Sequence, residues 1–300
     1  MFKNIPPITR NLLLVNVIAF LGCLLYGPAP NGGYRLNDLL GLHFFMASDF
    51  QPYQLLTYMF MHASFEHIFF NMFALWMFGC IVERVWGPKR YLFYYIFCGI
   101  GAGLLQEVAQ FFSVYAAFYQ SEPLSLGQAF GVMHQYASQL NGLTTVGASG
   151  AIYAILLAFG MTFPNERIFI FPLPVPIKAK YFVIGYAALE LLLAFGSQGD
   201  GVAHLAHLGG MLFGFILIRY WQKQTRANYR SQTNASIFRP RNRRWESRPD
   251  PSPEPRGENS ARTASFEQQE QINRILEKIR QSGYESLTFE EKQTLFNHRQ

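Results

Sequence analysis

The chain has 300 residues, of which 50% are hydrophobic and only 15% are charged, whereas soluble domains are about a quarter charged. Its formal net charge of +6 is concentrated late in the chain, because sixteen of the 25 Lys and Arg residues lie from residue 219 onward. No basic patch with interleaved aromatics, zinc-finger spacing or phosphate-binding glycine loop appears, so nucleic-acid binding is not expected. The first 218 residues have the composition of a membrane domain.

Six apolar runs are close to or longer than the roughly twenty residues that a helix needs to cross a bilayer. They cover residues 11–27, 55–81, 91–118, 147–163, 179–196 and 202–221. Gly, Pro and charged residues separate the runs, and alternate connecting segments hold eight Lys or Arg on one side and only Arg35 on the other. The positive-inside rule therefore predicts that both termini are cytoplasmic.

The first run resembles a signal peptide, with Lys3 and Arg10 before an apolar stretch. A lipoprotein-type cleavage before Cys23 is disfavoured, because Phe20 is a poor residue at the third position before that cysteine. No small-residue cleavage site of the ordinary signal-peptide type follows either, so we expect an uncleaved span. Cys23, Cys80 and Cys98 each lie inside an apolar run. An odd number in such positions argues against a disulfide framework and favours small apolar filling.

The chain changes character after the sixth run. Residues 223–265 are rich in Arg and Pro and predict a disordered linker, whose basic part would lie along the anionic inner leaflet. Residues 266–300 regain a helical apolar stripe, with a stop at Gly283 and a restart capped by Thr288. We therefore expect a domain of residues 1–222, the linker, and a small helical hairpin that is either a docking or self-association contact or a solvated stub.

Ser149 opens the fourth run, between Gly147 and Gly150. The first backbone N–H groups of a helix have no partner within the helix and favour an anion beside them. Small residues at the start of a membrane helix also serve close packing. The stretch alone therefore leaves both a nucleophile and a packing role open.

Two other runs carry polar groups at the same expected outer depth. The second holds His62, Glu66, His67 and Asn71, and the sixth holds His204 and His207. Polar residues are costly inside a membrane and mark functional sites by default. His67 and Asn71 are four residues apart and so share one helical face.

Three chemistries compete for this set of residues. A metalloprotease is disfavoured, because His62, Glu66 and His67 read H-x-x-x-E-H, which matches neither known helical zinc arrangement. Proton or ion transport, with Glu107 and Glu190 as further intramembrane acids, stays open but leaves the Ser149 stretch unexplained. Nucleophilic catalysis would use Ser149 with a histidine base, and no third acid is apparent, so the sequence predicts a dyad.

The residues carry a family resemblance at this point. The sequence resembles the rhomboid intramembrane serine proteases of the bacterial six-span type. The matching motifs, in order, are His67-Ile-Phe-Phe-Asn71, Gly147-Ala148-Ser149-Gly150 and Ala206-His207-Leu-Gly209-Gly210-Met-Leu-Phe-Gly214. Glu83-Arg84 and the glycines from Gly99 to Gly103 also fit, and the resemblance covers roughly residues 5–222. Tyr53-Gln54 stands where many members carry Trp-Arg.

The resemblance implies roles for individual residues. Ser149 would be the nucleophile and His207 the general base, while His67, Asn71 and the Ser149 amide would hold the oxyanion beside Gly147. Gly209 and Gly210, with Gly214 one turn later, would let the sixth span approach the fourth. His204 would be structural or water-facing, and His62 a polar group near the outer loop.

The resemblance also implies the fold and the activity. It predicts an all-α membrane protein, a six-transmembrane-helix rhomboid bundle with a small C-terminal cytoplasmic helical hairpin, spanning the bacterial inner membrane several times. Its expected activity is that of a serine endopeptidase that cleaves transmembrane protein substrates in or beside their membrane helices, with no cofactor or metal. The alternative is a catalytically silent rhomboid-like protein that only binds membrane helices.

Overall fold

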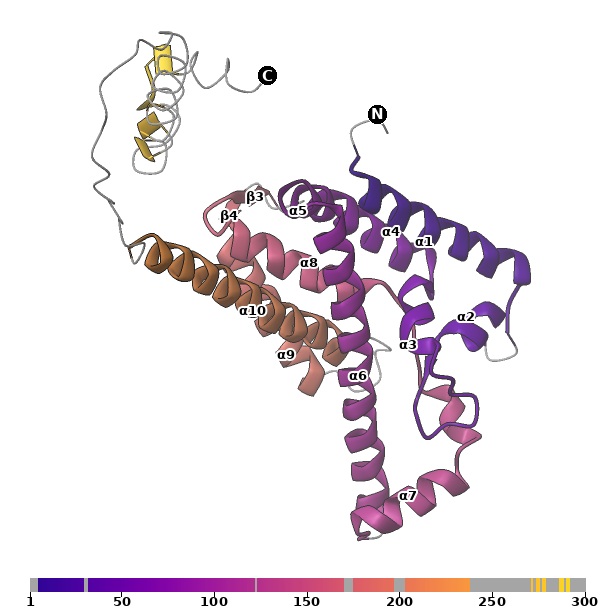
Figure 1. The fold of residues 1–300 in the computed structure, drawn as a ribbon. Helices are drawn as coiled ribbons and strands as arrows, with labels where there is room; N and C mark the ends of the chain where they lie inside the picture. The colour runs from indigo at the N-terminus through magenta and orange to yellow at the C-terminus, as the bar shows by residue number, and fades with distance from the viewer. Residues whose placement is uncertain are drawn as a thin grey trace, which may run out of the picture. The chain divides into compact units, whose positions relative to one another are not determined.

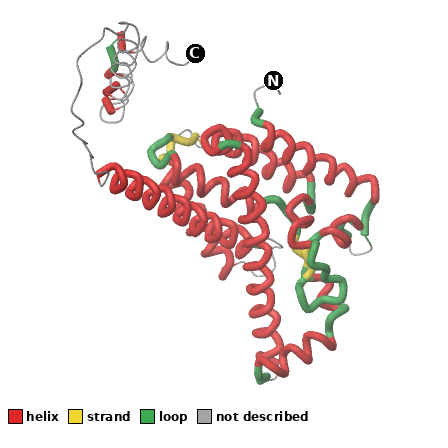
Figure 2. Tube along the Cα trace, in the orientation of Figure 1, coloured by secondary structure: helices red, strands yellow, loops and turns green. Residues whose placement is uncertain are grey.

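The computed structural model describes residues 5–29, 32–121, 123–169, 175–196 and 203–237, together with residues 271, 274, 275, 277, 278, 286–288, 290 and 291. Residues 1–238 and 239–300 form two separate units. In the first unit, helices dominate and only two short strand pairs occur among the described residues (Figures 1 and 2). The expected linker after residue 237 and most of the expected hairpin lie outside the described residues.

The elements of the first unit follow one another in this order: α1 (Pro7–Tyr26), α2 (Arg35–Leu40), β1 (Leu42–His43), α3 (Gln54–Thr57), the 3-10 turn η2 (Tyr58–Phe60), α4 (Phe65–Ala74), the π turn η3 (Leu75–Gly79), α5 (Cys80–Trp86), α6 (Pro88–Ser121), α7 (Leu126–Gln135), the 3-10 turn η4 (Gln139–Gly142), β2 (Thr144–Thr145), α8 (Ser149–Thr162), β3 (Arg167–Phe169), β4 (Pro176–Lys178), α9 (Ala179–Gly196) and α10 (His204–Ile237).

Helix α8 forms the centre of the bundle. Most of its residues are buried, and α6, α9, α10 and the α4–α5 segment pack around it. Its small residues allow this crowding, because Ala and Gly let neighbouring backbones approach closely. The main apolar cluster joins α8 to the tyrosines Tyr91, Tyr94 and Tyr95 of α6.

Several helices present apolar side chains outward. Leu25 of α1, Phe70 of α4 and Leu192 of α9 are 88%, 66% and 71% exposed. Such exposed apolar surface is typical of a protein whose outside is covered by lipid. Within the described residues, the helical segments Pro7–Tyr26, Phe65–Trp86 and Pro88–Gln120 are long and apolar enough to cross a membrane, and Ser149–Thr162 is a shorter apolar helix.

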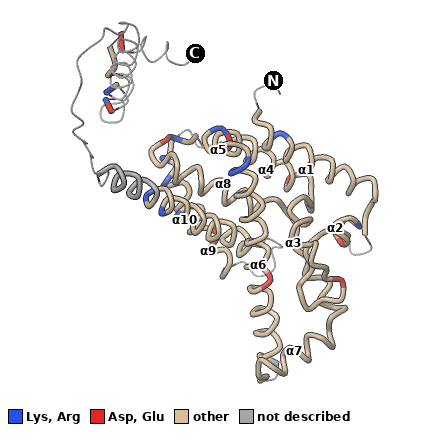
Figure 3. The backbone as a smooth tube through the Cα atoms, viewed as in Figure 1, with Lys and Arg blue, Asp and Glu red and all other residues tan. Residues whose placement is uncertain are grey.

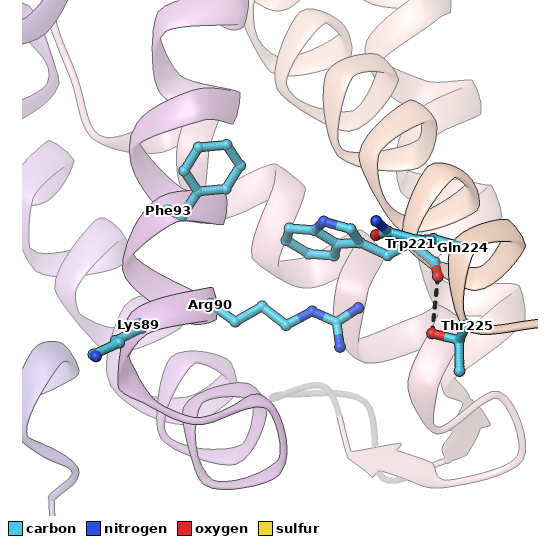
Figure 4. A pocket seen from close by; sticks show the side chains of 6 residues that line it. All are labelled: Lys89, Arg90, Phe93, Trp221, Gln224 and Thr225. Carbon is cyan, nitrogen blue, oxygen red and sulfur yellow. Dashed lines mark hydrogen bonds between the residues drawn. The ribbon is translucent and has the colours of Figure 1, made fainter. Parts of the chain in front are cut away.

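One end of the bundle, here called the basic end, gathers Lys and Arg. Figure 3 shows these residues around α5, the start of α6 and the β3–β4 pair, and along the middle of α10. A cavity of about 410 Å³ lies at this end, and Figure 4 shows the side chains that line it: Lys89, Arg90, Phe93, Trp221, Gln224 and Thr225. The guanidinium of Arg90 lies 4.2 Å from the centre of the Trp221 ring.

At this basic end the carboxylate of Glu83, on α5, holds the start of α1. It accepts hydrogen bonds from the Ile8 and Thr9 amides at 2.9 and 2.7 Å and from the Thr9 hydroxyl at 2.7 Å. These amides belong to the first turn of α1 and have no partner inside the helix. A negative charge there also complements the helix dipole.

At the opposite end, the loop after β1 is fixed to the segment that precedes α8. Strands β1 and β2 pair antiparallel, with Leu42 opposite Thr145. Glu107 of α6 accepts a hydrogen bond from the Phe45 amide at 2.6 Å. Gln54, 1% exposed, accepts from the His43 amide and donates to the Asp49 carbonyl. Gln54 therefore organises this loop.

Residues 123–145, part of the 119–145 segment whose role does not follow from the sequence, cover this end of the bundle. Helix α7 begins with a capping box between Ser125 and Gln128. Its buried Ala129 and Met133 pack with Phe44 in a small apolar cluster of their own. The segment is therefore the cover of the loop after β1.

The structure corrects two element boundaries. The second apolar run was expected to be one helix over 55–81, but the chain breaks at Met61–Ser64, and Ser64 caps α4 by accepting from the His67 amide. His62 therefore precedes the helix that carries His67. Helix α10 continues to Ile237, so residues 223–237, expected as linker, are helical.

The cysteines and the C-terminal cap agree with expectation. Cys23, Cys80 and Cys98 are free and buried. In the second unit, the Thr288 hydroxyl accepts from the Glu291 amide, as an N-cap does, and Lys278 contacts the Glu291 carboxylate at 2.8 Å. The hydrogen bond from Lys278 holds the pKa of Glu291 below its usual value.

Candidate active site

Ser149 is the first residue of α8, directly after a strained turn. Gly147 has φ 137°, which L-residues with side chains rarely adopt, and its amide donates to the Tyr58 carbonyl at 2.9 Å. A Cβ on Gly147 would lie 2.9 Å from His67 Nε2 and 3.4 Å from Ser149 Oγ. Gly147 thus leaves open a small space that both side chains border.

Helix α4 brings His67 and Asn71 to this region. The Ala63 amide donates to His67 Nδ1 at 3.4 Å, which leaves Nε2 as the protonated ring nitrogen. Asn71 is 7% exposed, and its amide nitrogen has no hydrogen-bond partner in the described part of the chain. The two side chains offer donors from one helical face.

His207, in the first turn of α10, reaches Ser149. Its Nε2 lies 2.8 Å from Ser149 Oγ, within hydrogen-bond distance. The ring stacks on that of Tyr153, one turn after Ser149, with centroids 4.2 Å apart and planes 6° from parallel. The ring position is therefore set from α8 as well as from α10.

A carboxylate stands behind His207. Glu190, on α9, has Oε2 2.9 Å from His207 Nδ1 and 2.7 Å from His204 Nδ1, and its Oε1 accepts the Tyr153 hydroxyl. A carboxylate only accepts, so both Nδ1 atoms are the protonated ones and His207 Nε2 is free to accept from Ser149.

This arrangement corrects one expectation and narrows another. The sequence predicted no third acid, yet Glu190 occupies that place. Of the two roles expected for His204, structural or water-facing, the structure agrees with the first, because His204 is 7% exposed and bonded to Glu190. In the sequence Glu190 stands out only as an intramembrane acid. It lies in the fifth run, toward the outer end at which Ser149 is also expected, and this position is the signal that could have placed it near His207.

Glycines set how closely the helices approach around the site. A Cβ on Gly210 would lie 2.7 Å from the carbonyl carbon of Gly150, so α10 rests on the backbone of α8 at this point. One on Gly214 would lie 3.1 Å from the Tyr94 ring. Gly209 differs from expectation: it faces Ala102 and Leu105 of α6 rather than the fourth run.

The structure also bears on metal binding. Glu66 is exposed whereas His62 is fully buried, so the H-x-x-x-E-H residues do not converge on one ion. Glu190, His204 and His207 are the described residues whose ligand atoms gather, within 4.8 Å of one another. Tetrahedral zinc ligands at about 2.05 Å from the metal are about 3.3 Å apart. The observed separations of 2.7 and 2.9 Å are those of hydrogen bonds.

The two acids that a transport path would share have separate partners. Glu107 binds the loop after β1 through the Phe45 amide, whereas Glu190 binds Tyr153 and the two histidines. No hydrogen bond between described residues links the two carboxylates. Their contacts do not form the chain of titratable groups that proton transfer needs.

Comparison with known proteins identifies the family. Residues 49–224 match the Rhomboid domain. The chain belongs to the rhomboid family. Its helices and exposed apolar surface make it an integral membrane protein of this family. Residues 259–299 match a family of unknown function, DUF6576.

Individual relatives include named rhomboid proteases. The chain is 26% identical over 216 residues to the rhomboid protease AarA of Providencia stuartii, covering 70% of each chain. It is 27% identical over 218 residues to the putative rhomboid protease YdcA of Bacillus subtilis, covering 72% of this chain and 89% of that one. A third relative, RHOMBOID-like protein 12, mitochondrial, of Arabidopsis thaliana, is 28% identical over 74% of this chain and 60% of its own.

Proposed function

We propose that this rhomboid-family protein is an intramembrane serine endopeptidase that uses Ser149 as nucleophile and His207 as general base. The observation that carries the proposal is the 2.8 Å separation of Ser149 Oγ and His207 Nε2 in a membrane domain. A silent relative that only binds helices has no need of a nucleophile within hydrogen-bond reach of a base. The named proteases among its relatives support the same activity.

The proposed reaction follows from the positions of the donors and acceptors. Ser149 Oγ attacks the carbonyl carbon of the scissile peptide bond while His207 Nε2 takes the hydroxyl proton. The carbonyl oxygen becomes an oxyanion that accepts from the Ser149 amide, His67 Nε2 and Asn71 Nδ2. His207 then gives the proton to the leaving amine, and the C–N bond breaks.

The acyl-enzyme is released by the reverse use of the same groups. A water molecule attacks the ester carbonyl as His207 removes its proton, and the proton returns to Ser149 Oγ when the C–O bond breaks. The unpartnered Asn71 amide supports its role, because a buried donor without an acceptor is costly unless a ligand supplies one.

The substrate and the topology are part of the proposal. Substrates are transmembrane proteins cut in or beside their membrane helices. We propose six spans, adding α8, α9 and α10 to the three longer helical segments, in a bacterial inner membrane with both termini cytoplasmic. The gathering of Lys and Arg at the basic end supports this orientation. The C-terminal hairpin, with a docking or self-association role, stays a prediction.

The test measures cleavage of a single-span substrate in liposomes and labelling by a fluorophosphonate probe, which needs no knowledge of the substrate. Ser149→Ala should abolish both, and His207→Ala should lower both by at least about 10³-fold. Ser138→Ala and His134→Ala, at exposed positions outside the site, are matched controls expected to retain parental activity. Cleavage that survives Ser149→Ala, or absence of both cleavage and labelling in the parent, contradicts the proposal.

A further inference from the structure

The carboxylate of Glu190 collects three donors from two neighbouring helices. Tyr153 of α8 donates to Oε1, and His204 and His207 of α10 donate to Oε2. The residue is 4% exposed and lies within α9. A buried carboxylate is costly unless both oxygens are hydrogen-bonded, and here both are.

The contact with His207 has a chemical consequence. The bond from Nδ1–H to Glu190 fixes the tautomer in which Nε2 carries a lone pair, and Nε2 is the atom that faces Ser149. When His207 takes the serine proton, its ring becomes cationic, and the adjacent carboxylate stabilises that charge. Without Glu190 the ring could turn or hold its proton on the wrong nitrogen.

The other two donors keep the carboxylate in place. The Tyr153 ring stacks on His207 while its hydroxyl binds Glu190, so one residue fixes both partners of the contact. His204, three residues before His207 at the start of α10, binds the same oxygen. The carboxylate thus has little freedom to leave His207.

We propose that Glu190 is a positioning residue for the catalytic base, so that the site works as a Ser149–His207–Glu190 triad held by Tyr153 and His204. This inference rests on the proposed function of Ser149 and His207. Among the described residues, Glu190 is the contribution of α9 to the hydrogen-bonded site. The position of α9 then determines whether His207 keeps the tautomer and orientation in which Nε2 accepts the Ser149 proton.

The test compares kcat and KM of the parent with those of Glu190→Ala and Glu190→Gln. We expect Glu190→Ala to lower kcat by roughly 10²–10⁴-fold with KM changed by less than about threefold, because substrate binding does not involve Glu190. Glu190→Gln should lie between, since its amide oxygen accepts from Nδ1–H but carries no charge. A kcat within threefold of the parent in both variants overturns the inference.

A spectroscopic measurement separates positioning from mere support of the fold. Ring ¹⁵N NMR of His207 should show a protonated Nδ1 and an unprotonated Nε2 in the parent, and a mixture of tautomers in Glu190→Ala. Glu190→Leu, which also lacks an acceptor for Nδ1–H, provides the same reading if the alanine variant does not fold. An unchanged tautomer in either of these two variants, folded but with low kcat, contradicts positioning.

Matched controls distinguish the alternatives. Glu107→Gln removes another buried carboxylate, outside the site, and should keep a kcat within about threefold of the parent. A chelator should leave the parent unaffected; loss of activity that added zinc restores would overturn the inference in favour of a metal at Glu190, His204 and His207. If the parent neither cleaves nor is labelled, the proposed function fails, whereas a kcat of Glu190→Ala and Glu190→Gln within threefold of an active parent defeats only this inference.

Discussion

Helix α10 packs differently in its first turns, near the site, and around Trp221, near its middle. Near the site no side chain separates α10 from α8 at Gly210, which lies directly against the backbone carbonyl of Gly150. At the basic end the space between α10 and α6 is filled by large groups: the Trp221 ring meets Trp86 edge-on at 5.8 Å and lies under the Arg90 guanidinium. Figure 4 shows the open cavity beside them.

The difference teaches where the molecule needs fixed geometry. A backbone-to-backbone contact has no side-chain torsions through which it can adjust, so it sets the distance between Ser149 and His207 narrowly. Aromatic rings and a long cation can repack around a cavity and tolerate change. Substitutions along α10 should therefore lose their effect on catalysis from the site toward the basic end.

The largest effect is expected at Gly210. In Gly210→Ala the new methyl group would collide with the Gly150 carbonyl, so α10 must move away from α8 and carry His207 with it. We expect loss of more than about 3 kcal/mol of stability and at least a 10²-fold fall in cleavage. Thermal unfolding and cleavage in liposomes measure both.

Gly185→Ala is the matched control for that substitution, because nothing lies within 4 Å of its Cβ position on α9. Alanine is the better helix former, so this variant should be as stable as the parent or more so, with unchanged cleavage. Equal losses in the two variants would show that helix glycines matter here for a reason other than the α8–α10 contact.

A smaller effect is expected for Trp221→Ala. The variant removes ring contacts with Trp86, Phe93 and Tyr94 and should cost about 2 kcal/mol, because Trp221 is only partly buried. Cleavage by the folded protein should stay within threefold of the parent, and Trp221→Phe should recover part of the stability. A large fall in kcat at unchanged fold would contradict the contrast between the first turns of α10 and the region around Trp221.

The smallest effect is expected for Arg90→Gln. It removes a cation that lies 4.2 Å from the Trp221 ring centre and 5.2 Å from that of Trp86. Cation–π contacts at such partly exposed sites contribute about 0.5–1 kcal/mol. Arg90→Lys should keep part of this stability, as measured by thermal unfolding, and neither variant should alter cleavage.

The sequence was sufficient for the groups whose relation is local. The four-residue spacing of His67 and Asn71 puts both on one face of α4, and the Ser149 motif opens a helix as expected. The expected depth of each span in the membrane also predicts that Ser149 and His207 lie at the same level. The structure places Ser149 Oγ and His207 Nε2 2.8 Å apart, within hydrogen-bond distance.

The sequence was insufficient where relations are tertiary. Glu190 lies 41 residues after Ser149 and 17 before His207, so only the packing of α9 against α8 and α10 reveals it. The break before α4 was missed because Met61–Ser64 carries neither Gly nor Pro, and the Ser64 cap was not recognised. The role of 123–145 depends on contacts with a loop about ninety residues earlier.

The β1–β2 pair connects the loop after β1 to the active site through a short stretch of chain. Thr145 is paired to Leu42, Gly147 is tied to Tyr58, and α8 starts at Ser149. At no more than about 3.6 Å per residue, this four-residue arm holds little slack. A displacement of the loop after β1, caused by a docking protein or by lateral tension in the lipid, would therefore also displace the first turn of α8 and Ser149.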